Sequence, residues 1–427
     1  MAVDPQRATR HLRDILGSGG IAGAVKQMAS NGAPATARVP HPTRFDDVAI
    51  RKRWHLLSAP AVAEAELLDA DTRRRADVYA RHIENFIGTV KVPVGLAGPL
   101  RVNGVHAQGD FYVPLATTEA ALVASYSRGA TLITQAGGCA AATLNEGVGR
   151  APAFAFRSIV EAGTFVQWCL GNQEKIRSAA ESTTRHGKLV DLRFTVEANH
   201  VYLLLHFTTG DAAGQNMATI ATQAACDYVV THCPTRPEYW FVESNMSGDK
   251  KASSQSFQSV RGRKVTAEVR LAGSLVERHL HTTPRRMVEY WRMSAVGSVL
   301  SGTIGIQGHY ANGLAALFIA CGQDAACVAE AAVGLTRFEL TDDGGLYAAV
   351  TLPAVIIGTV GGGTGLPSQR ACLDLLGLAG PGRARALGEL CAALALAGEL
   401  SIIGALSAHE FTRAHQRLAR APASLLP

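Results

Sequence analysis

The chain of 427 residues is sparing in features that mark several classes of protein. Aromatic residues make up only 6%, and there is neither a run of five like charges nor a basic stripe interleaved with aromatics, which argues against a nucleic-acid partner. The eight cysteines are scattered and form no Cys-x-x-Cys pair, a pattern typical of reduced core thiols. We therefore expect no disulfide framework, no metal and a cytoplasmic location.

Long uninterrupted hydrophobic runs are also missing. The most apolar stretch, 391–408, carries Glu399 near its middle, so we expect a buried helix and no membrane span. No hydrophobic signal core follows the arginines near the start of the chain. The chain is instead rich in hydrophobic residues (47%) and in glycine (43 residues), enough for a large core with many tight turns and for two or three domains. Its net charge of +6 suits acidic ligands.

The hydrophobic pattern divides the chain into three parts. Residues 1–87 predict a flexible lead-in and a small helical N-terminal part. Residues 152–241 predict the βαββαβ order of a ferredoxin-like module. Its expected strands lie near 154–159, 192–197, 201–207 and 239–242, and its expected helices near 164–180 and 214–230. The fold class is therefore α+β, with this module inserted into a large α/β domain, 88–151 and 242–427, built around a central buried helix.

The stretch from Ala116 to Gly138 predicts that central helix. Its many small residues let neighbouring backbones approach closely, while aliphatic residues provide contacts on more than one face. Glu119 would lie in the first turn, after a Thr117 cap, where a carboxylate complements the helix dipole. Taken alone, this stretch favours a capping role for Glu119 over a catalytic one.

Two glycine-rich turns are candidate anion sites. The turn 208–217 follows a buried strand and opens a helix, where unpaired N–H groups favour a phosphate, although a plain strand-to-helix turn is an equal alternative. It lacks the Gly-x-Gly-x-x-Gly spacing of a Rossmann fold. The turn 358–365 has three consecutive glycines, which favour close approach to a ligand.

Several charged residues are ambiguous when each is taken alone. Asp324 follows an apolar helix among small residues and needs a cation or a shared proton. The loop Asp249-Lys250-Lys251 has the composition of a solvated turn, and His415 among arginines that of a surface histidine. Only their combination with other motifs favours a site.

Seven motifs, in their order, resemble one family: the catalytic portion of 3-hydroxy-3-methylglutaryl-coenzyme A reductase, in the NADPH-dependent class I form and without its membrane anchor. The resemblance covers roughly residues 80–420. The motifs are Glu84-Asn85-x-Ile87-Gly88, Pro93-x-Gly95-x-Ala97-Gly98-Pro99-Leu100, Ala116-Thr117-Thr118-Glu119, Gly210-Asp211-Ala212-x-Gly214-x-Asn216-Met217, Asp249-Lys250-Lys251, Gly322-Gln323-Asp324-Ala325-Ala326 and Gly358-Thr359-Val360-Gly361-Gly362-Gly363-Thr364.

The resemblance implies a four-electron reduction of 3-hydroxy-3-methylglutaryl-coenzyme A to mevalonate and free coenzyme A, with two NADPH per turnover. Lys250 would stabilise the charge that develops on the carbonyl oxygen. Glu119 would be the acid, with its pKa raised by Asp324, which would also bond Lys250. His415 would protonate the departing thiolate. The inserted module would bind NADP, and active sites would form between subunits of a homodimer or a dimer of dimers.

The resemblance also assigns the binding residues. Those of the acyl pocket would be Arg150, Asp249, Lys251 and Asn312, with Arg292 as the substrate's second cation. Those that contact coenzyme A would be Ser125 and Arg128. Those on the nicotinamide-dinucleotide side would be Arg185, Asp211, Asn216, Gly361, Gly362, Gly363 and Arg420. Arg185 would read the 2′-phosphate, because a guanidinium binds phosphate in a bidentate way.

Two departures from the family pattern leave alternatives open. Glu243 stands where the family has a small substrate-binding hydroxyl, and Met293 stands where a lysine pairs with the substrate carboxylate, with Arg292 one place earlier. One alternative is therefore a paralogous reductase that uses the same two-hydride mechanism on a different acyl thioester. A non-catalytic protein that keeps the fold is the other, against which the retention of all four catalytic positions argues.

Overall fold

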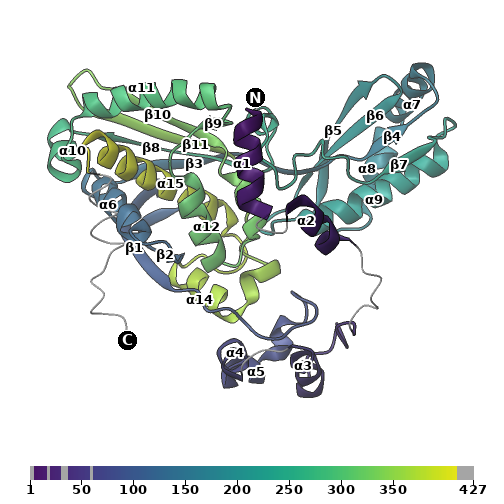
Figure 1. The fold of residues 1–427 in the computed structure, drawn as a ribbon. Helices are drawn as coiled ribbons and strands as arrows, with labels where there is room; N and C mark the ends of the chain where they lie inside the picture. Colours follow the sequence, from purple (N-terminus) through teal and green to yellow (C-terminus); the bar gives the residue numbers. More distant parts are fainter. Residues whose placement is uncertain (1–3, 17–19, 30–36, 58–60, 411–427) are drawn as a thin grey trace. The chain divides into compact units, whose positions relative to one another are not determined.

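The computed structural model describes residues 4–16, 20–29, 37–57 and 61–410. The described residues divide into two units, one up to Thr89 and one from Val90 onward, and Figure 1 labels the helices and strands of each. Part of the predicted flexible lead-in lies outside the described residues.

The N-terminal unit is helical, and its buried cluster lies within residues 45–87. Its helices are α1 (Pro5–Leu16), α2 (Gly20–Met28), α3 (Asp47–Trp54), α4 (Ala61–Leu67) and α5 (Ala70–Arg74), with a 3₁₀ turn at Ala76–Tyr79. Ile50, Trp54 and Phe86 lie in its core. Arg53 is only 1% exposed, and its guanidinium donates to the main-chain oxygens of Phe86 (2.7 Å) and Pro40 (3.2 Å). These hydrogen bonds compensate for burial of the cation.

The second unit is built on one extended, mostly antiparallel sheet. Its strands are β1 (Val94–Gly104), β2 (Gln108–Ala116), β3 (Cys139–Arg150), β4 (Ala153–Ala155), β5 (Lys188–Glu197), β6 (His200–Thr208), β7 (Tyr239–Phe241), β8 (Gly262–Leu271), β9 (Gly305–Ile306), β10 (Gly334–Leu340) and β11 (Leu346–Val355). The path runs β7-β4-β6-β3-β8-β11-β10-β9, with β1 on β3, β2 on β1 and β5 on β6. Only the β1–β3 and β9–β10 pairs are parallel.

The helices of the second unit surround this sheet. They are α6 (Leu122–Gln135), α7 (Ile159–Gly171), α8 (Gln173–Glu181), α9 (Gln215–His232), α10 (Gly273–Leu280), α11 (Pro284–Ser301), α12 (Tyr310–Ala320), α13 (Val328–Ala331), α14 (Pro367–Leu375) and α15 (Ala384–Ser407). Short 3₁₀ turns occur at Ser254–Phe257, Ala325–Cys327 and Gly362–Gly365.

Residues 153–241 follow the predicted βαββαβ order. The helical part between β4 and β5 is split into α7 and α8 at Asn172, and the four strands lie in the order β7-β4-β6-β5 with every pair antiparallel. β3 joins this part to the rest of the unit, because its end pairs with β6 at 148–150 while its earlier residues pair with β8. Arg150, at the end of β3, is thereby placed between the two parts of the sheet.

The central helix of the large domain is α15, not the stretch around Glu119. α15 is long and apolar enough to cross a membrane, but nearly all of its residues are buried among β8, β11, β3, α6 and α12. The prediction of a buried helix over 391–408 is confirmed. The prediction that 116–138 is the central helix is wrong in position, because α6 is shorter and packs along one side of α15.

The start of α6 also differs from the prediction. The helix begins at Leu122, after Ala121 in the left-handed region at φ 69° and without a side-chain cap. Thr117 instead accepts a hydrogen bond from the Glu119 amide within a turn (3.0 Å). Glu119 is therefore an exposed residue of the connection between β2 and α6, free of the helix-capping role that the sequence favoured.

The crossing of α6 and α15 explains the small residues of both helices. A Cβ added at Gly129 would lie 1.8 Å from the main-chain oxygen of Ala397. Tyr126 fills the next layer, and Gly398 and Gly313 leave room for its ring. At this crossing the two helices touch through their main chains, so a clash cannot be relieved by the rotation of a side chain.

Replacing Gly129 by alanine tests this contact. We expect Gly129→Ala to lower the free energy of unfolding by about 1–3 kcal/mol or more, because the added methyl group overpacks the crossing. Gly163→Ala in α7 is the matched control, since nothing lies within 4 Å of its added Cβ; it should stabilise by about 0.4–1 kcal/mol. Urea unfolding measures both, and equal midpoints for the two variants would contradict the account.

Candidate active site

Lys250 and Asp324 form an ion pair between two distant parts of the chain. Lys250 lies in the loop 243–252, after β7, and its Nζ is 2.8 Å from Asp324 Oδ2. Asp324 follows α12 and caps the turn Ala325–Cys327 through the Ala326 amide (3.0 Å). The hydrogen bond that Lys250 donates to Asp324, more than any other contact, raises the pKa of Lys250. The cation that the sequence required for Asp324 is therefore Lys250, held in its charged form.

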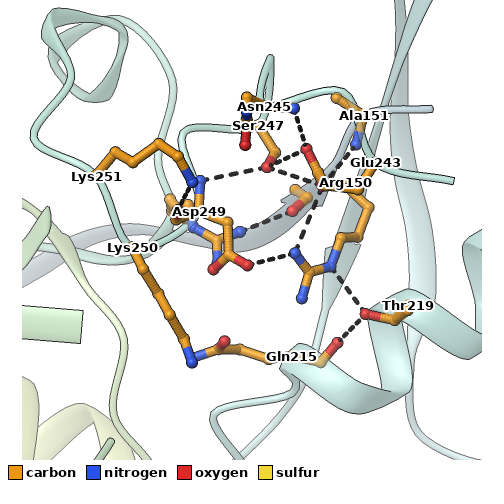
Figure 2. A network of polar contacts seen from close by, with 12 residues as sticks. Arg150, Ala151, Gln215, Thr219, Glu243, Asn245, Ser247, Asp249, Lys250 and Lys251 are labelled. Carbon is orange, nitrogen blue, oxygen red and sulfur yellow. Dashed lines mark hydrogen bonds and ion pairs between the residues drawn. The ribbon is translucent and has the colours of Figure 1, made fainter. Parts of the chain in front are cut away.

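Asp249, next to this lysine, lies between two arginines, and Figure 2 shows it with one of them, Arg150. Arg150 donates to Asp249 Oδ2 at 2.6 Å, and Arg261 donates to Oδ1. Burial by itself would raise the pKa of Asp249, but the hydrogen bond from Arg150 and the charges of both arginines outweigh it, so the pKa is lowered. The carboxylate is thus ionised and fixed in place. Lys251 completes the group by donating to the Asp249 main-chain oxygen (2.8 Å).

Glu243 holds the other end of the same loop. Its carboxylate accepts hydrogen bonds from the amides of Ser244 (3.1 Å) and Asn245 (2.8 Å) and from the Ser247 hydroxyl (3.0 Å to each oxygen). Figure 2 shows it turned toward Arg150, whose Nη1 lies 3.5 Å away. The carboxylate that departs from the family pattern therefore has a local role in closing the loop onto Arg150.

Arg261 and Glu330 are functional candidates that the sequence reasoning missed. Arg261 Nε is 2.7 Å from Glu330 Oε2, and the two side chains are 5% and 3% exposed. Arg261 also donates to the Gly149 main-chain oxygen (2.8 Å), while Glu330 accepts from the Lys250 amide (3.3 Å). For Glu330 the signal available was a single charged residue inside an apolar segment, the same signal that singled out Glu399, whereas Arg261 lies in a polar, basic stretch that offers no such signal.

Glu119 and Asn312 form a second polar group. Asn312 Nδ2 donates to Glu119 Oε2 at 2.7 Å from the first turn of α12. The Glu119 charge also acts on the buried His309, whose ring stacks on Tyr126 at 4.8 Å between centroids. Burial lowers the pKa of His309. Among the described residues, no hydrogen bond or ion pair joins this group directly to Lys250, and α12 is the element that connects Asn312 to Asp324 along the chain.

The fully buried Glu399 of α15 fixes the start of α12. Its carboxylate accepts hydrogen bonds from the amides of Gly308 (3.0 Å) and His309 (2.7 Å) and from the Thr336 hydroxyl (2.7 Å). Burial raises the pKa of Glu399 to about 7. The position of Asn312 and its bond to Glu119 thus depend on a carboxylate that titrates near neutrality.

Three of the glycine-containing motifs, those that begin at Gly210, Gly322 and Gly358, meet in one place. The Thr359 amide donates to the Asp211 main-chain oxygen (2.9 Å), and Gln323 exchanges two hydrogen bonds with Gly358 (2.8 and 3.0 Å). Gly214 ends the first motif at φ 75° and opens α9 without a side-chain cap. The turn at 361–363 lies beside Gly322. Uncapped amides at α9 and the glycine turn fit the phosphates of a dinucleotide.

The remaining predicted residues have varied environments. Asp211 accepts from the Gly382 and Ala384 amides at the start of α15 (2.7 and 3.1 Å), so both of its oxygens have protein partners. Ser125 and Arg128 both bond to the Ser401 hydroxyl (2.9 and 3.0 Å). Those that are exposed and make no hydrogen bond or ion pair within the described part of the chain are Arg185, Asn216 and Arg292. His415 and Arg420 lie outside the described residues.

This arrangement suits a reaction in which an oxygen atom gains negative charge. The Lys250 side chain is 41% exposed, and its ammonium group is held in position by Asp324. Such a preorganised cation stabilises an oxyanion without reorganising in the transition state. Glu119 provides an exposed carboxylate for proton transfer. Among the described residues, no group of three or more His, Cys, Asp or Glu side chains could hold a metal ion.

Comparisons with known proteins identify a matching family and several similar proteins. Residues 49–420 match the protein family described as hydroxymethylglutaryl-coenzyme A reductase. The 3-hydroxy-3-methylglutaryl-coenzyme A reductase of Methanocaldococcus jannaschii is 43% identical over 347 residues, covering 80% of this chain and 85% of that protein. Its counterpart in Haloferax volcanii is 44% identical over 351 residues, covering 81% and 86%. The class II enzyme of Streptococcus pneumoniae, solved with NADPH, has a similar fold (TM-score 0.63, 22% identity, covering 83% and 96%).

The fold and site first define a class: a mixed α+β protein with a lysine–aspartate ion pair at the end of a network of paired charges. The matched length and the identities then decide the family. The chain belongs to the hydroxymethylglutaryl-coenzyme A reductase family.

The burial of Glu399 predicts how stability changes with pH. Its pKa rises from about 4.5 in the unfolded chain to about 7 in the fold, so the folded state binds the proton more tightly. Above pH 7 the ionised Glu399 therefore lowers the free energy of unfolding. Lowering the pH from 8 to 5 should raise the free energy of unfolding, by about 1.4 kcal/mol for each unit of difference between the folded and unfolded pKa.

Glu399→Gln tests this pH dependence. Urea unfolding midpoints measured from pH 8 to pH 5 should show a smaller rise in this variant than in the parent. Glu389→Gln, at an equally buried position of α15, should keep the parental rise because Glu399 is intact. The same rise in Glu399→Gln as in the parent would assign the pH dependence to other groups.

Proposed function

We propose that this protein reduces 3-hydroxy-3-methylglutaryl-coenzyme A to mevalonate and free coenzyme A with two NADPH per turnover. The observation that carries the proposal is the Lys250–Asp324 pair, with its exposed ammonium group, next to the loop that holds Arg150 and Asp249. Membership of the family supports the same reaction.

The residues divide the work of a thioester reduction. Lys250 stabilises the negative charge on the carbonyl oxygen, and Asp324 keeps the ammonium group protonated and aimed. Glu119, oriented by Asn312, passes a proton to that oxygen, and His415 protonates the leaving thiolate. NADPH supplies, when bound, the two hydrides of the four-electron reduction, and two protons from the protein and solvent complete the alcohol and the thiol.

The binding groups follow from the same proposal. Arg150, Asp249, Lys251 and Arg292 bind the acyl group, and Ser125 and Arg128 bind coenzyme A in place of their contact with Ser401. The inserted module at 152–241 binds NADPH, with its phosphates near Asn216 and the glycines 361–363, helped by Asp211 and Arg420. No metal takes part in this scheme.

We also propose that the protein is a cytoplasmic homodimer, or a dimer of dimers, of the class I form. A row of apolar side chains on α11 is exposed in the single chain, and Met293 (75%), Val299 (77%) and Leu300 (83%) belong to it. Burial of such a row against a second subunit removes apolar area from water. Arg292 is adjacent, so a partner subunit at this face would bring it to an acyl pocket.

A different acyl thioester is the second candidate substrate. Arg150 already shares its charge between Asp249 and Glu243, and Met293 offers no cation. Because two carboxylates of the protein already neutralise Arg150, this pocket binds a substrate carboxylate less strongly than a pocket whose arginine has no such partners. Turnover of other acyl-coenzyme A thioesters, without turnover of the hydroxymethylglutaryl thioester, would favour this candidate.

Loss of the Lys250 ammonium group tests the reaction. NADPH oxidation with 3-hydroxy-3-methylglutaryl-coenzyme A, followed by absorbance, should have a kcat about 10²–10³-fold lower in Lys250→Met, because the oxyanion loses its cation. Lys52→Met, at an exposed lysine of the N-terminal unit, is the control and should keep the parental rate. Equal rates for the two variants would remove Lys250 from the mechanism.

Arg185 should decide the preference for NADPH over NADH. We expect Arg185→Gln to raise the KM for NADPH about 10–100-fold and to leave that for NADH unchanged, because a charged hydrogen-bond partner of the 2′-phosphate is lost. Arg193→Gln, on β5 of the same module and paired with Asp191, should change neither value. A parallel change with both cofactors in Arg185→Gln would reject this role.

A further inference from the structure

Lys250 is held at both of its ends by one short segment of the chain. Asp324 bonds the ammonium group at 2.8 Å, and Glu330, six positions later, accepts the hydrogen bond of the Lys250 amide at 3.3 Å. Between them lie only the turn Ala325–Cys327 and the start of α13. The positions of these two carboxylates therefore fix both the main chain of Lys250 and its ammonium group.

The backbone of Lys250 needs such support. Its φ is 55°, in the left-handed region that residues with a Cβ adopt at a cost in energy. A small pocket beside the loop is lined by Lys251, Arg261 and Glu330. The hydrogen bond from the Lys250 amide to Glu330 and the ion pair of its ammonium group with Asp324 hold the residue in this conformation.

Arg261 ties the segment to the loop and to the sheet. Its guanidinium contacts Glu330, Asp249 and the main-chain oxygen of Gly149. Glu330 accepts the hydrogen bond of the Lys250 amide, and Asp249 precedes Lys250 in the chain. The Arg261 side chain is 5% exposed, and a buried guanidinium with three acceptors in a fixed fork has one favourable orientation. Lysine could not replace it, because an ammonium group lacks the fork.

We propose that Glu330 and Arg261 are positioning residues for Lys250: their buried ion pair fixes the left-handed backbone of the lysine and so aims its ammonium group at the reacting oxygen. The effect on turnover rests on the proposed function, whereas the effect on the lysine itself does not. A misplacement of about 1 Å at a catalytic group costs about 10²-fold in rate.

The test compares Glu330→Ala and Glu330→Gln with Glu389→Gln. Glu389 is also fully buried and accepts main-chain amides, those of His106 and Ala107 (2.8 Å each), on another side of the fold. We expect Glu330→Ala to lower kcat about 10–100-fold with a much smaller change in KM. Glu330→Gln keeps an acceptor for the Lys250 amide and should recover part of this loss, and Glu389→Gln should keep the parental kcat per folded molecule.

A second measurement reports on Lys250 without turnover. Chemical labelling of its amine as a function of pH, read by mass spectrometry of the peptide, gives the pKa of this one lysine. In Glu330→Ala the pKa should fall toward that of free lysine, because a displaced ammonium group loses its hydrogen bond to Asp324. If Glu330→Ala does not fold, Arg261→Lys carries the test with the same expected fall in kcat and in the Lys250 pKa.

The outcomes are distinguishable. A parental labelling profile in the folded variants, with kcat lowered only as much as in Glu389→Gln, would overturn the positioning role. Absence of turnover in the parent protein would reject the proposed function alone, because the labelling profiles would still decide whether Glu330 and Arg261 position the lysine.

Discussion

Pairing of buried and half-buried charges is the constraint on which this site depends. A charged side chain that leaves water needs a partner, and here each partner is shared with the next. Arg150 reaches Asp249, Asp249 reaches Arg261, and Arg261 reaches Glu330, which holds the main chain of Lys250. The network joins the end of β3, the loop 243–252 and the segment after α12. Breaking one member exposes its neighbour as an unpaired charge, so the network behaves as one unit.

A second constraint is the closeness of the main chain around α12 and α15. Gly129 and Gly398 let α6 and Tyr126 approach α15, and Glu399 of α15 fixes the first amides of α12. Because α12 carries Asn312 near its start and leads to Asp324 after its end, one buried helix sets the distance between the two polar groups of the site. The packing of the core thus determines the positions of the site residues through α12, a helix whose side chains are almost all apolar.

Sequence reasoning located most of the elements, and the family resemblance predicted the Lys250–Asp324 pair that the fold shows. The order of strands and helices in 153–241 and the buried helix at the end of the chain follow from local periodicity, which a single sequence contains. The start of α6 could not be predicted in this way, because the Thr117 hydroxyl can accept a hydrogen bond from an amide of its own turn as readily as from the first turn of a helix. The contacts of Asp249 with Arg150 and Arg261 were not predicted, and Arg261 and Glu330 belong to no motif that pattern or resemblance singled out. Only the fold shows that these charges meet.

The central claim is that this site completes two successive reductions on one thioester. The most direct measurement is the ratio of NADPH oxidised to 3-hydroxy-3-methylglutaryl-coenzyme A consumed, with the product identified by mass. The account predicts a ratio of two, with mevalonate and free coenzyme A as products. A ratio of one with an aldehyde product, or no oxidation by folded protein that binds NADPH, would contradict it.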